Sequence, residues 1–304
     1  MKKTNVLGID LGGTKAAIGI ISPNGKVLKK RIIKIDVQKG EKHLFNELIA
    51  NGKELISKYK VSAVGIASAG PINLKKGTLE NPTNFPGWKT VHIVKNLKKG
   101  FNLPVGFDND AAGAALAELW IGAGKKVKSL VCVTLGTGVG TGLIIDKKIF
   151  RGGCGFAGEG GHLIIEKNNR LCGCGNFGCI ETVVSGNAFG KTMEEFTNIK
   201  CSGSQAVELV KSKNPKALKA IKAYQQSFAI TLHNYAVAYN PELIVISGGF
   251  SNAHSLFLNE SVKILKTMMK RKMFLMPKIA LAKCKDEAGL IGAGYIAFRE
   301  IGVL

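Results

Sequence analysis

The sequence predicts an α/β protein built as two similar lobes with a cleft between them. The chain has 304 residues, of which 45% are apolar, so it is long enough for two domains with sizeable cores. Residues 5–23 favour two short strands joined by a glycine turn, and residues 129–150 repeat that plan. This repeat indicates two similarly built domains, each with a glycine hairpin that faces the other.

The first half alternates strands and helices. Residues 27–36 favour a third strand after the first hairpin, and apolar residues recur at helical spacing within 41–59. Residues 72–88 are rich in Pro, Gly and Asn and predict a long loop, which tends to be functional. Residues 103–107 favour a strand and AAGAALAELW a helix. Asp110 is therefore expected near the end of a strand and the start of a helix.

The second half contains an irregular segment and several helices. Residues 150–181 are rich in Gly and Cys, residues 203–240 look helical, and PELIVISGGF predicts a strand that ends in a Gly-Gly turn. We expect the first lobe to span residues 1–118 and the second residues 119–289. The closing helix, at about 290–304, is expected to pack back on the first lobe.

The charge balance invites nucleic acid but lacks the residues that read it. Lys and Arg number 43 against 21 acidic residues, a net charge of +22. Only five of the basic residues are Arg, and the Lys are scattered as doublets rather than gathered with aromatic residues. We therefore expect no nucleic-acid partner. The bland interpretation is a solvated Lys-rich surface that also attracts phosphorylated small molecules.

Membrane insertion and export are not expected. No apolar run approaches the roughly 18–20 residues of a membrane helix. Asp10 and the glycines after it interrupt the stretch where the apolar part of a signal peptide would lie. Seven Cys, an odd number, indicate metal chemistry in a reducing cytosol rather than a set of disulfides. We expect a cytoplasmic protein.

The first glycine turn is a candidate phosphate site. Between Asp10 and Lys15 lie Gly12, Gly13 and Thr14. Glycines let backbone N–H groups approach an anion closely, the acid could reach a hydrated Mg²⁺, and the hydroxyl and amine could bind phosphate oxygens. The same glycines also suit an ordinary tight hairpin. A Walker loop and a dinucleotide fingerprint are excluded because both lead into a helix.

The second glycine turn contains Gly136, Thr137 and Gly138 and is again flanked by β-branched runs. Its letters match a dinucleotide fingerprint, but the context is strand to strand. Two phosphate-binding hairpins, one in each lobe, suit a nucleoside triphosphate in a cleft.

A metal site is the strongest local signal. His162 precedes Cys172, Cys174 and Cys179, and glycines lie between the thiols in CGCGNFGC. Three thiolates and an imidazole complete a tetrahedral zinc shell with no open position, so the zinc would be structural. The alternative is that these are reduced bystander thiols. The remaining cysteines have no such neighbours in sequence: Cys132, Cys154, Cys201 and Cys284.

Two acids accompany the predicted metal loop. Glu159 lies just before His162, and Glu181 lies just after the last thiol. A metal-bound imidazole keeps one ring nitrogen as a donor, so the folded loop would aim acids and a donor at one place, as a polyhydroxylated substrate requires. The alternative for each acid alone is a solvated surface residue.

Seven motifs together resemble the ROK family, a group of sugar kinases with related repressors in the actin-like ATPase superfamily. The resemblance implies the two-lobed actin-like ATPase (ribonuclease H-like) fold. It covers nearly the whole chain, and the middle motifs are specific to the family. The motifs are DLGGTK at 10–15, NFPGW at 84–88, FDND at 107–110, LGTGVGTG at 135–142, GEGGH at 158–162, CGCGNFGCIE at 172–181 and ISGGF at 246–250.

The resemblance also implies residue roles. Asp110 matches the family's catalytic aspartate. Residues implied to bind the sugar are Gly70, Asn84, Asn109, Asp110, Glu159, His162 and Glu181. Residues implied to bind ATP with Mg²⁺ are Asp10, Gly12, Gly13, Thr14, Lys15, Gly136, Thr137 and Gly138, with Gly248 and Gly249 near the adenosine. Family repressors carry a DNA-binding module before DLGGTK; we expect none here, because that hairpin begins within about ten residues of the start. Family members are commonly dimers, so a homodimer is expected.

The implied reaction moves the γ-phosphoryl group of MgATP to a hexose hydroxyl, most often that on C6, with glucose the commonest substrate. Fructose, mannose, allose, N-acetylglucosamine and N-acetylmannosamine are family alternatives. An aspartate pKa near about 3.9, lowered further by a helix N-terminus, would make Asp110 a weak base. It is therefore expected to orient the hydroxyl and accept its proton late.

Three competing hypotheses remain. The protein could be a non-catalytic sugar sensor, a basic protein that associates with RNA or membranes, or an actin-like filament former.

Overall fold

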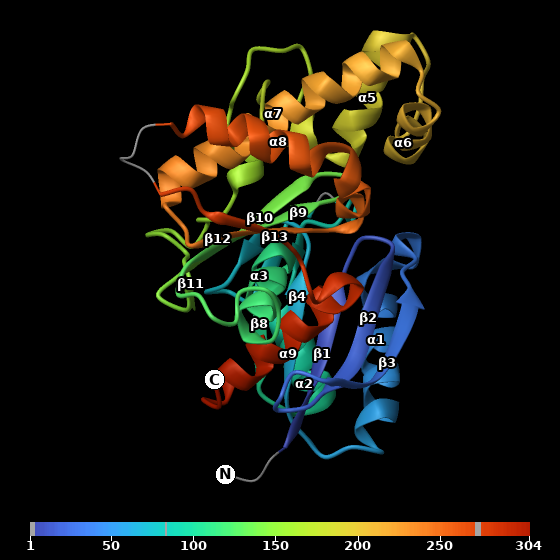
Figure 1. Ribbon diagram of the computed structural model, residues 1–304. Coiled ribbons are helices and arrows are strands. Elements are labelled where there is room, and N and C mark those ends of the chain that lie inside the picture. The colour runs from blue at the N-terminus through green and yellow to red at the C-terminus, as the bar shows by residue number, and fades with distance from the viewer. Residues whose placement is uncertain (1–3, 83, 271–274) are drawn as a thin grey trace. The chain divides into compact units, whose positions relative to one another are not determined.

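The computed structural model describes residues 4–82, 84–270 and 275–304. The chain forms two compact units. The first comprises the chain up to Lys125, Arg151–Phe156 and Cys284–Leu304, and the second comprises Lys126–Phe150 and Ala157–Lys283. Figure 1 shows the elements of each unit. The short segment Arg151–Phe156 groups with the first unit although the chain on either side of it belongs to the second.

The first unit has a five-stranded sheet in the order β3-β2-β1-β4-β8 and a small sheet in the order β5-β6-β7. Its elements are β1 (Asn5–Leu11), β2 (Lys15–Ile21), β3 (Val27–Lys34), α1 (Gly40–Ile56), β4 (Val61–Ser68), β5 (Ile72–Asn73), β6 (Thr78–Glu80), β7 (Thr90–Val91), α2 (Ile93–Phe101), β8 (Val105–Asn109), α3 (Asp110–Trp120) and α9 (Ala288–Glu300), with 3-10 helices at Val37–Lys39 and Lys285–Glu287.

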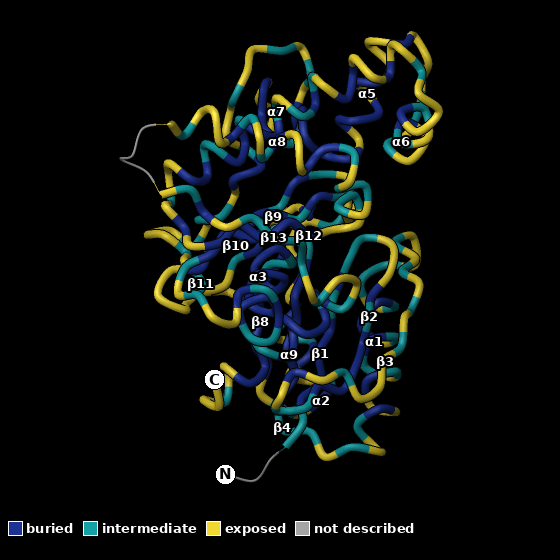
Figure 2. Tube along the Cα trace, viewed as in Figure 1, coloured by how far each residue is buried: buried dark blue, intermediate teal, exposed yellow. Residues whose placement is uncertain are grey.

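The residues of β1 alternate between two packed faces of the sheet, as the period of a strand requires. Leu7 and Ile9 are fully buried in a cluster with side chains of α1 and α2. Val6 points to the other face, where it packs with Leu290 and Phe298 of α9. The sheet is therefore covered on both sides, and its buried residues concentrate in β1, β2, β4 and β8 (Figure 2).

A row of glycines lets α9 approach the sheet closely. Gly19, Gly8, Gly65 and Gly106 are paired side by side across β2, β1, β4 and β8. A Cβ atom at Gly65 would collide with the carbonyl oxygen of Ala293 in α9. The red helix in Figure 1 therefore lies directly on the strands. This contact brings the start of α9 to the end of β1.

The second unit has a sheet in the order β11-β10-β9-β12-β13, which repeats the pattern of antiparallel and parallel pairs in the first. Its elements are β9 (Leu130–Leu135), β10 (Val139–Ile145), β11 (Lys148–Ile149), α4 (Glu181–Val184), α5 (Gly186–Thr197), α6 (Gly203–Lys211), α7 (Pro215–Tyr239), β12 (Leu243–Ser247), α8 (His254–Met268) and β13 (Lys278–Leu281), with 3-10 helices at Gly160–His162 and Gly249–Ala253.

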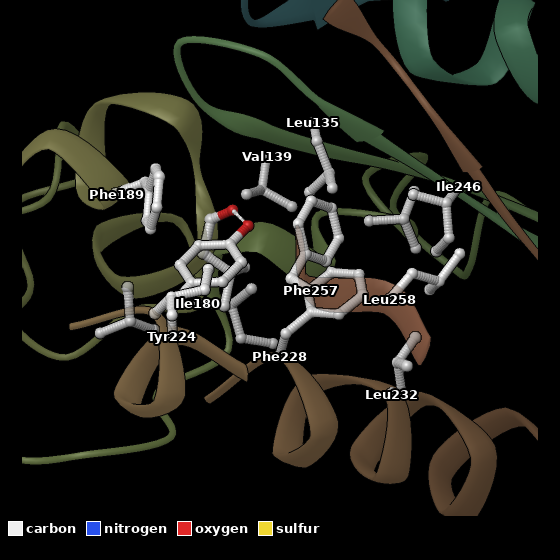
Figure 3. Packing of buried hydrophobic residues seen from close by; sticks show 14 of the residues in the cluster. Leu135, Val139, Ile180, Phe189, Tyr224, Phe228, Leu232, Ile246, Phe257 and Leu258 are labelled. Carbon is white, nitrogen blue, oxygen red and sulfur yellow. Dashed lines mark hydrogen bonds between the residues drawn. The ribbon is translucent and has the colours of Figure 1, made fainter. Parts of the chain in front are cut away.

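An aromatic core supports the glycine hairpin of this unit. Leu135 and Val139, on either side of the turn, are buried in the same cluster as Phe189 and Tyr224 (Figure 3). The rings of Phe189 and Tyr224 meet edge to face at 5.0 Å between centroids. Such pairs add stability beyond the area that they bury. Close-packed side chains of this cluster therefore support the turn between β9 and β10.

The region predicted to be helical, 203–240, forms two helices. α6 ends at Lys211, and α7 begins at Pro215, with Asn214 capping it through bonds from the N–H groups of Lys216 and Ala217. Proline has no N–H to donate and is tolerated at the first helical position but not further in. None of the helices in the described part of the chain is long and apolar enough to span a membrane.

Candidate active site

The predicted site residues of the first unit lie at one edge of its main sheet. β1, β4 and β8 are parallel neighbours whose last residues pair across the sheet. Asp10 lies near the end of β1, Gly70 follows β4, and Asn109 ends β8 just before Asp110. Ligands of open α/β sheets bind at the carboxyl ends of the strands. The four residues are therefore gathered where this fold class places its ligands.

The first glycine turn lies against the long loop. The Gly12 N–H donates a 3.0 Å hydrogen bond to the carbonyl oxygen of Lys15 and closes the turn. A Cβ atom at Gly13 would collide with the Asn84 side chain, so these two residues are in contact distance. Thr14 and Lys15 are exposed. The structure thus brings a predicted phosphate residue beside a predicted sugar residue.

Asn109 has a structural role that the sequence analysis did not foresee. It is the N-cap of α3, and its Oδ1 accepts hydrogen bonds from the N–H groups of Ala111 at 2.8 Å and Ala112 at 3.2 Å. Asp110 is the first residue of the helix, and its Oδ1 accepts a 2.7 Å bond from the Ala111 N–H. The cap therefore fixes the direction in which the Asp110 carboxylate leaves the sheet.

The electrostatics of Asp110 differ from the prediction. The helix N–H groups do lower its pKa, but desolvation by burial is the larger effect, so the pKa is raised above its ordinary value. The prediction considered only the local helix terminus and was wrong in direction. Burial and repulsion by Asp110 raise the pKa of Asp10, and the attraction of Lys15 lowers it by a smaller amount. The net result is a pKa of about 6. Asp10 and Asp110 are thus close enough to repel each other.

In the second unit the two glycine turns of the predicted nucleotide site adjoin. β9 and β12 are parallel neighbours, so Gly136 and Gly248 follow the ends of adjacent strands. Gly248 has a φ of +85° and lies so close to Leu135 that a Cβ atom would collide with that residue's backbone. Gly249 begins the 3-10 helix after it. These glycines therefore present backbone rather than side chains at this edge of the sheet.

Glu181 joins the glycine hairpin to the metal loop. Its Oε2 accepts a 3.0 Å hydrogen bond from the N–H of Val139, and its Oε1 lies 3.5 Å from Sγ of Cys172. A Cβ atom at Gly138 would collide with the same carboxylate. The hairpin glycine is thus required by a neighbouring acid as well as by any phosphate. The sequence analysis placed Glu181 beside the metal loop and in the sugar site, but not against this hairpin.

The structure brings the four predicted metal ligands together. Their ligand atoms all lie within 4.8 Å of one another. His162 Nδ1 is 3.4 Å from Sγ of Cys172, and the Sγ atoms of Cys174 and Cys179 are 3.6 Å apart. Zinc bonds of about 2.3 Å to sulfur and 2.0–2.1 Å to nitrogen, set tetrahedrally, separate the ligand atoms by about 3.5–3.8 Å. The residues therefore fit a zinc ion.

The other imidazole nitrogen points toward an acid. His162 Nε2 lies 3.8 Å from Oε2 of Glu159, while Nδ1 faces the thiols. A carboxylate beside the second nitrogen of a ligating histidine fixes the ring's orientation and its tautomer. Glu159, His162 and Glu181 therefore cluster around the metal loop, as the sequence suggested.

The sequence analysis missed two buried carboxylates of the first unit. Asp108, fully buried at the end of β8, forms ion pairs with Arg151 and, at 3.3 Å, with Arg299. Glu118, fully buried in α3, accepts bonds from the N–H groups of Ala123 and Cys284, each at 2.7 Å. Asp108 was inside the quoted FDND motif, and Glu118 interrupts an apolar helix. Both are signals of a buried, partnered charge.

These partners lie where the chain passes between the two units. At Arg151 the chain returns from the second unit to the first for a short segment, and at Cys284 it returns to the first unit for the last time. Asp108 and Glu118 therefore hold the first residues of two such segments. Asp108 lies two residues before Asp110, and Glu118 lies in the helix that Asp110 begins.

The chain belongs to the ROK family, whose sequence profile matches residues 6–300. It is 29% identical to a glucokinase of Thermotoga maritima, over 99% of this chain and 100% of that protein. It is 31% identical to a glucokinase of Halalkalibacterium halodurans, over 97% and 95%. A xylose repressor of Caldicellulosiruptor bescii is 28% identical over 95% of this chain and 76% of that protein.

Solved structures agree with this assignment. A ROK hexokinase from Thermus thermophilus has a TM-score of 0.86 and 28% identity, covering 98% of this chain and 99% of that one. A ROK glucokinase from Streptomyces griseus in complex with glucose and AMPPNP has a TM-score of 0.83 and 26% identity, covering 97% and 99%. The predicted family and the predicted α/β actin-like ATPase fold class are confirmed.

Proposed function

We propose that this protein is an ATP-dependent sugar kinase that transfers the γ-phosphoryl group to a hexose hydroxyl, with glucose and its C6 hydroxyl as the leading candidates. The observation that carries the proposal is the position of Asp110. It lies at the first turn of α3, on the sheet edge that also holds Asp10 and the first glycine turn. The two glucokinase relatives support the same activity.

Asp110 is proposed to accept the proton of the attacking hydroxyl. Burial raises its pKa, so the ionised carboxylate is a better proton acceptor than an ordinary aspartate. Phosphoryl transfer passes through a loose transition state, in which alignment and neutralisation of charge contribute more than early deprotonation. Asp110 is therefore proposed to orient the hydroxyl first and to take its proton as the phosphoryl group transfers.

Asp10 is proposed to face the magnesium ion of the nucleotide. Desolvation and the repulsion by Asp110 raise its pKa to about 6, and a nearby cation would relieve both. Mg²⁺ would neutralise charge on the transferring phosphoryl group. The N–H groups of Gly12, Gly13 and Gly136–Gly138, with the Thr14, Lys15 and Thr137 side chains, are proposed to bind phosphate, and Gly248 and Gly249 to lie near adenosine.

Two sets of residues are proposed as sugar ligands. Gly70, Asn84 and Asn109 belong to the first unit, and Glu159, His162 and Glu181 belong to the second. Carboxylates and amides bind sugar hydroxyls through directed hydrogen bonds. Identity of the hexose depends on the placement of these few groups.

A zinc ion is proposed to hold the loop that carries the second set of sugar ligands. His162, Cys172, Cys174 and Cys179 form a complete shell of four ligands, so the metal would have a structural role and leave no position for substrate. The metal would fix the loop between Glu159 and Glu181. A homodimer is also proposed, and light scattering after size-exclusion chromatography measures it.

An ADP-release assay coupled to pyruvate kinase and lactate dehydrogenase tests the function. The purified protein is offered ATP and magnesium with glucose, fructose, mannose, allose, N-acetylglucosamine or N-acetylmannosamine. We expect sugar-dependent release of ADP with one of them, and glucose is expected to give the highest kcat/KM. If none of these sugars causes release of ADP, the proposal is contradicted.

A second candidate function follows from the repressor relative, with which 95% of this chain aligns. In that case the protein would bind sugar without phosphorylating it. Calorimetric binding of a sugar together with an absence of ADP release would favour this second function over the first.

A further inference from the structure

We propose that Thr141 is a positioning residue for sugar binding, whose buried hydroxyl holds the loop of Gly158–His162 on strand β10. The inference rests on the proposed function, because Glu159 and His162 in this loop are the proposed sugar ligands. Thr141 itself touches neither the sugar nor the metal ligands in this account and acts through the loop backbone.

The Thr141 hydroxyl makes two bonds to the loop. Its Oγ1 donates to the carbonyl oxygen of Gly158 and accepts a 2.8 Å bond from the N–H of Gly160. These two backbone groups lie on either side of Glu159. One side chain therefore satisfies both polar groups that flank a proposed ligand, in a place where Thr141 is only 8% exposed. These two hydrogen bonds hold the backbone on both sides of Glu159 and so set the direction of its side chain.

Glycines in the loop make these two hydrogen bonds possible. A Cβ atom at Gly160 would lie too close to Thr141 Oγ1 and to the ring of Tyr235, and one at Gly161 would collide with the carbonyl oxygen of Val139. The loop therefore lies directly on the backbone of β10. The 3-10 helix that carries His162 begins at Gly160, so the same contact sets the position of the imidazole.

The hydroxyl group, rather than the shape of the side chain, carries this role. Thr141→Val keeps the branched shape that suits a strand, but leaves the buried N–H of Gly160 and the partly buried carbonyl of Gly158 without their partner. The loop would then shift toward water. The N–H of Val139 would still bond to Glu181, so the glycine hairpin between β9 and β10 would keep its support.

Tyr235 supplies a matched control on the other side of Gly160. Its hydroxyl is buried and has no hydrogen-bond partner among the described residues. Tyr235→Phe removes this hydroxyl and keeps the ring that packs on the loop. Removal of an unpartnered buried hydroxyl is close to neutral.

The first measurement is hydrogen exchange of the amides from Glu159 to His162 in the ligand-free protein. In Thr141→Val these amides should exchange about ten times faster, because both hydrogen bonds from the loop to the hydroxyl are lost. Thr141→Ser, which keeps the hydroxyl, and Tyr235→Phe should match the wild-type rate. Unchanged exchange in the valine variant overturns the inference, whether or not the protein is a kinase.

The second measurement is calorimetric binding of glucose and of ADP. Thr141→Val is expected to weaken glucose binding by about tenfold and to leave the Kd for ADP within about twofold, while Thr141→Ser restores glucose binding. Equal losses for glucose and ADP would indicate a general structural role and overturn the inference. Should the valine variant not fold, Thr141→Ala replaces it in both measurements. Wild-type protein that neither binds nor phosphorylates any sugar contradicts the proposed function instead.

Discussion

Replacing Asp10 by asparagine should stabilise the ligand-free protein at neutral pH. Desolvation and the charge of Asp110 raise the pKa of Asp10 from 3.8 to about 6. The native state therefore binds the proton more tightly than the unfolded state. The stability that this group contributes is fully present below pH 3.8 and is lost as the pH rises through 6. At pH 7 the ionised Asp10 side chain destabilises the native state, whereas a neutral asparagine does not.

The size of the effect follows from the two pKa values. Their separation corresponds to about 3 kcal/mol at pH 7 and shrinks to below about 1 kcal/mol at pH 4. The attraction of Lys15 is already part of this net shift. The free energy of unfolding of Asp10→Asn should thus exceed that of the wild type, and the difference should grow as the pH rises.

Urea unfolding in magnesium-free buffer, followed by fluorescence between pH 4 and 8, measures this difference. Asp146→Asn, on an exposed turn between β10 and β11, is the matched control and should show no such dependence on pH. MgADP should stabilise the wild type more than Asp10→Asn, because the variant lacks the carboxylate that is proposed to face the cation. A variant less stable than the wild type at pH 7, or a difference that does not change with pH, would refute the reasoning.

Three further changes test other parts of the site. Asp108→Asn should lower the free energy of unfolding by about 3 kcal/mol, measured by urea titration, because two arginines lose a buried partner, one of them 39% exposed; a loss below about 1 kcal/mol would contradict the buried ion pair. Glu181→Ala should weaken ADP binding about tenfold by calorimetry, since the Val139 N–H loses its acceptor, whereas Glu181→Gln should not; equal affinities for the two variants would contradict this role. Cys174→Ser should reduce the zinc content below one ion per chain by mass spectrometry and open residues 155–181 to proteolysis; metal-free wild-type protein would contradict the zinc site.

Much of the fold could be predicted because its signals are local. Glycine turns between β-branched runs indicate the two hairpins, and the metal ligands are close in sequence, so chain geometry alone limits where they can lie. The first two strands and the four clustered ligands follow from such signals.

The remaining features depend on residues that are distant in sequence. Nothing near Asp108 reveals that Arg151 and Arg299 pack against it. The prediction for Asp110 included the helix terminus, which adjoins it in sequence, but not burial by the rest of the unit, which raises its pKa. The Thr141 hydroxyl likewise gains its meaning only when the loop of Gly158–His162 folds onto β10.

Phosphorus NMR of the protein with ATP, magnesium and glucose tests the account most directly. The wild type should convert the γ-phosphate signal of ATP into that of a sugar phosphate. Asp110→Asn should bind glucose with an unchanged Kd and form this product slower by several orders of magnitude. A sugar phosphate formed by Asp110→Asn at the wild-type rate, or free phosphate as the wild type's only product, would contradict the assignment of Asp110 as the group that receives the proton.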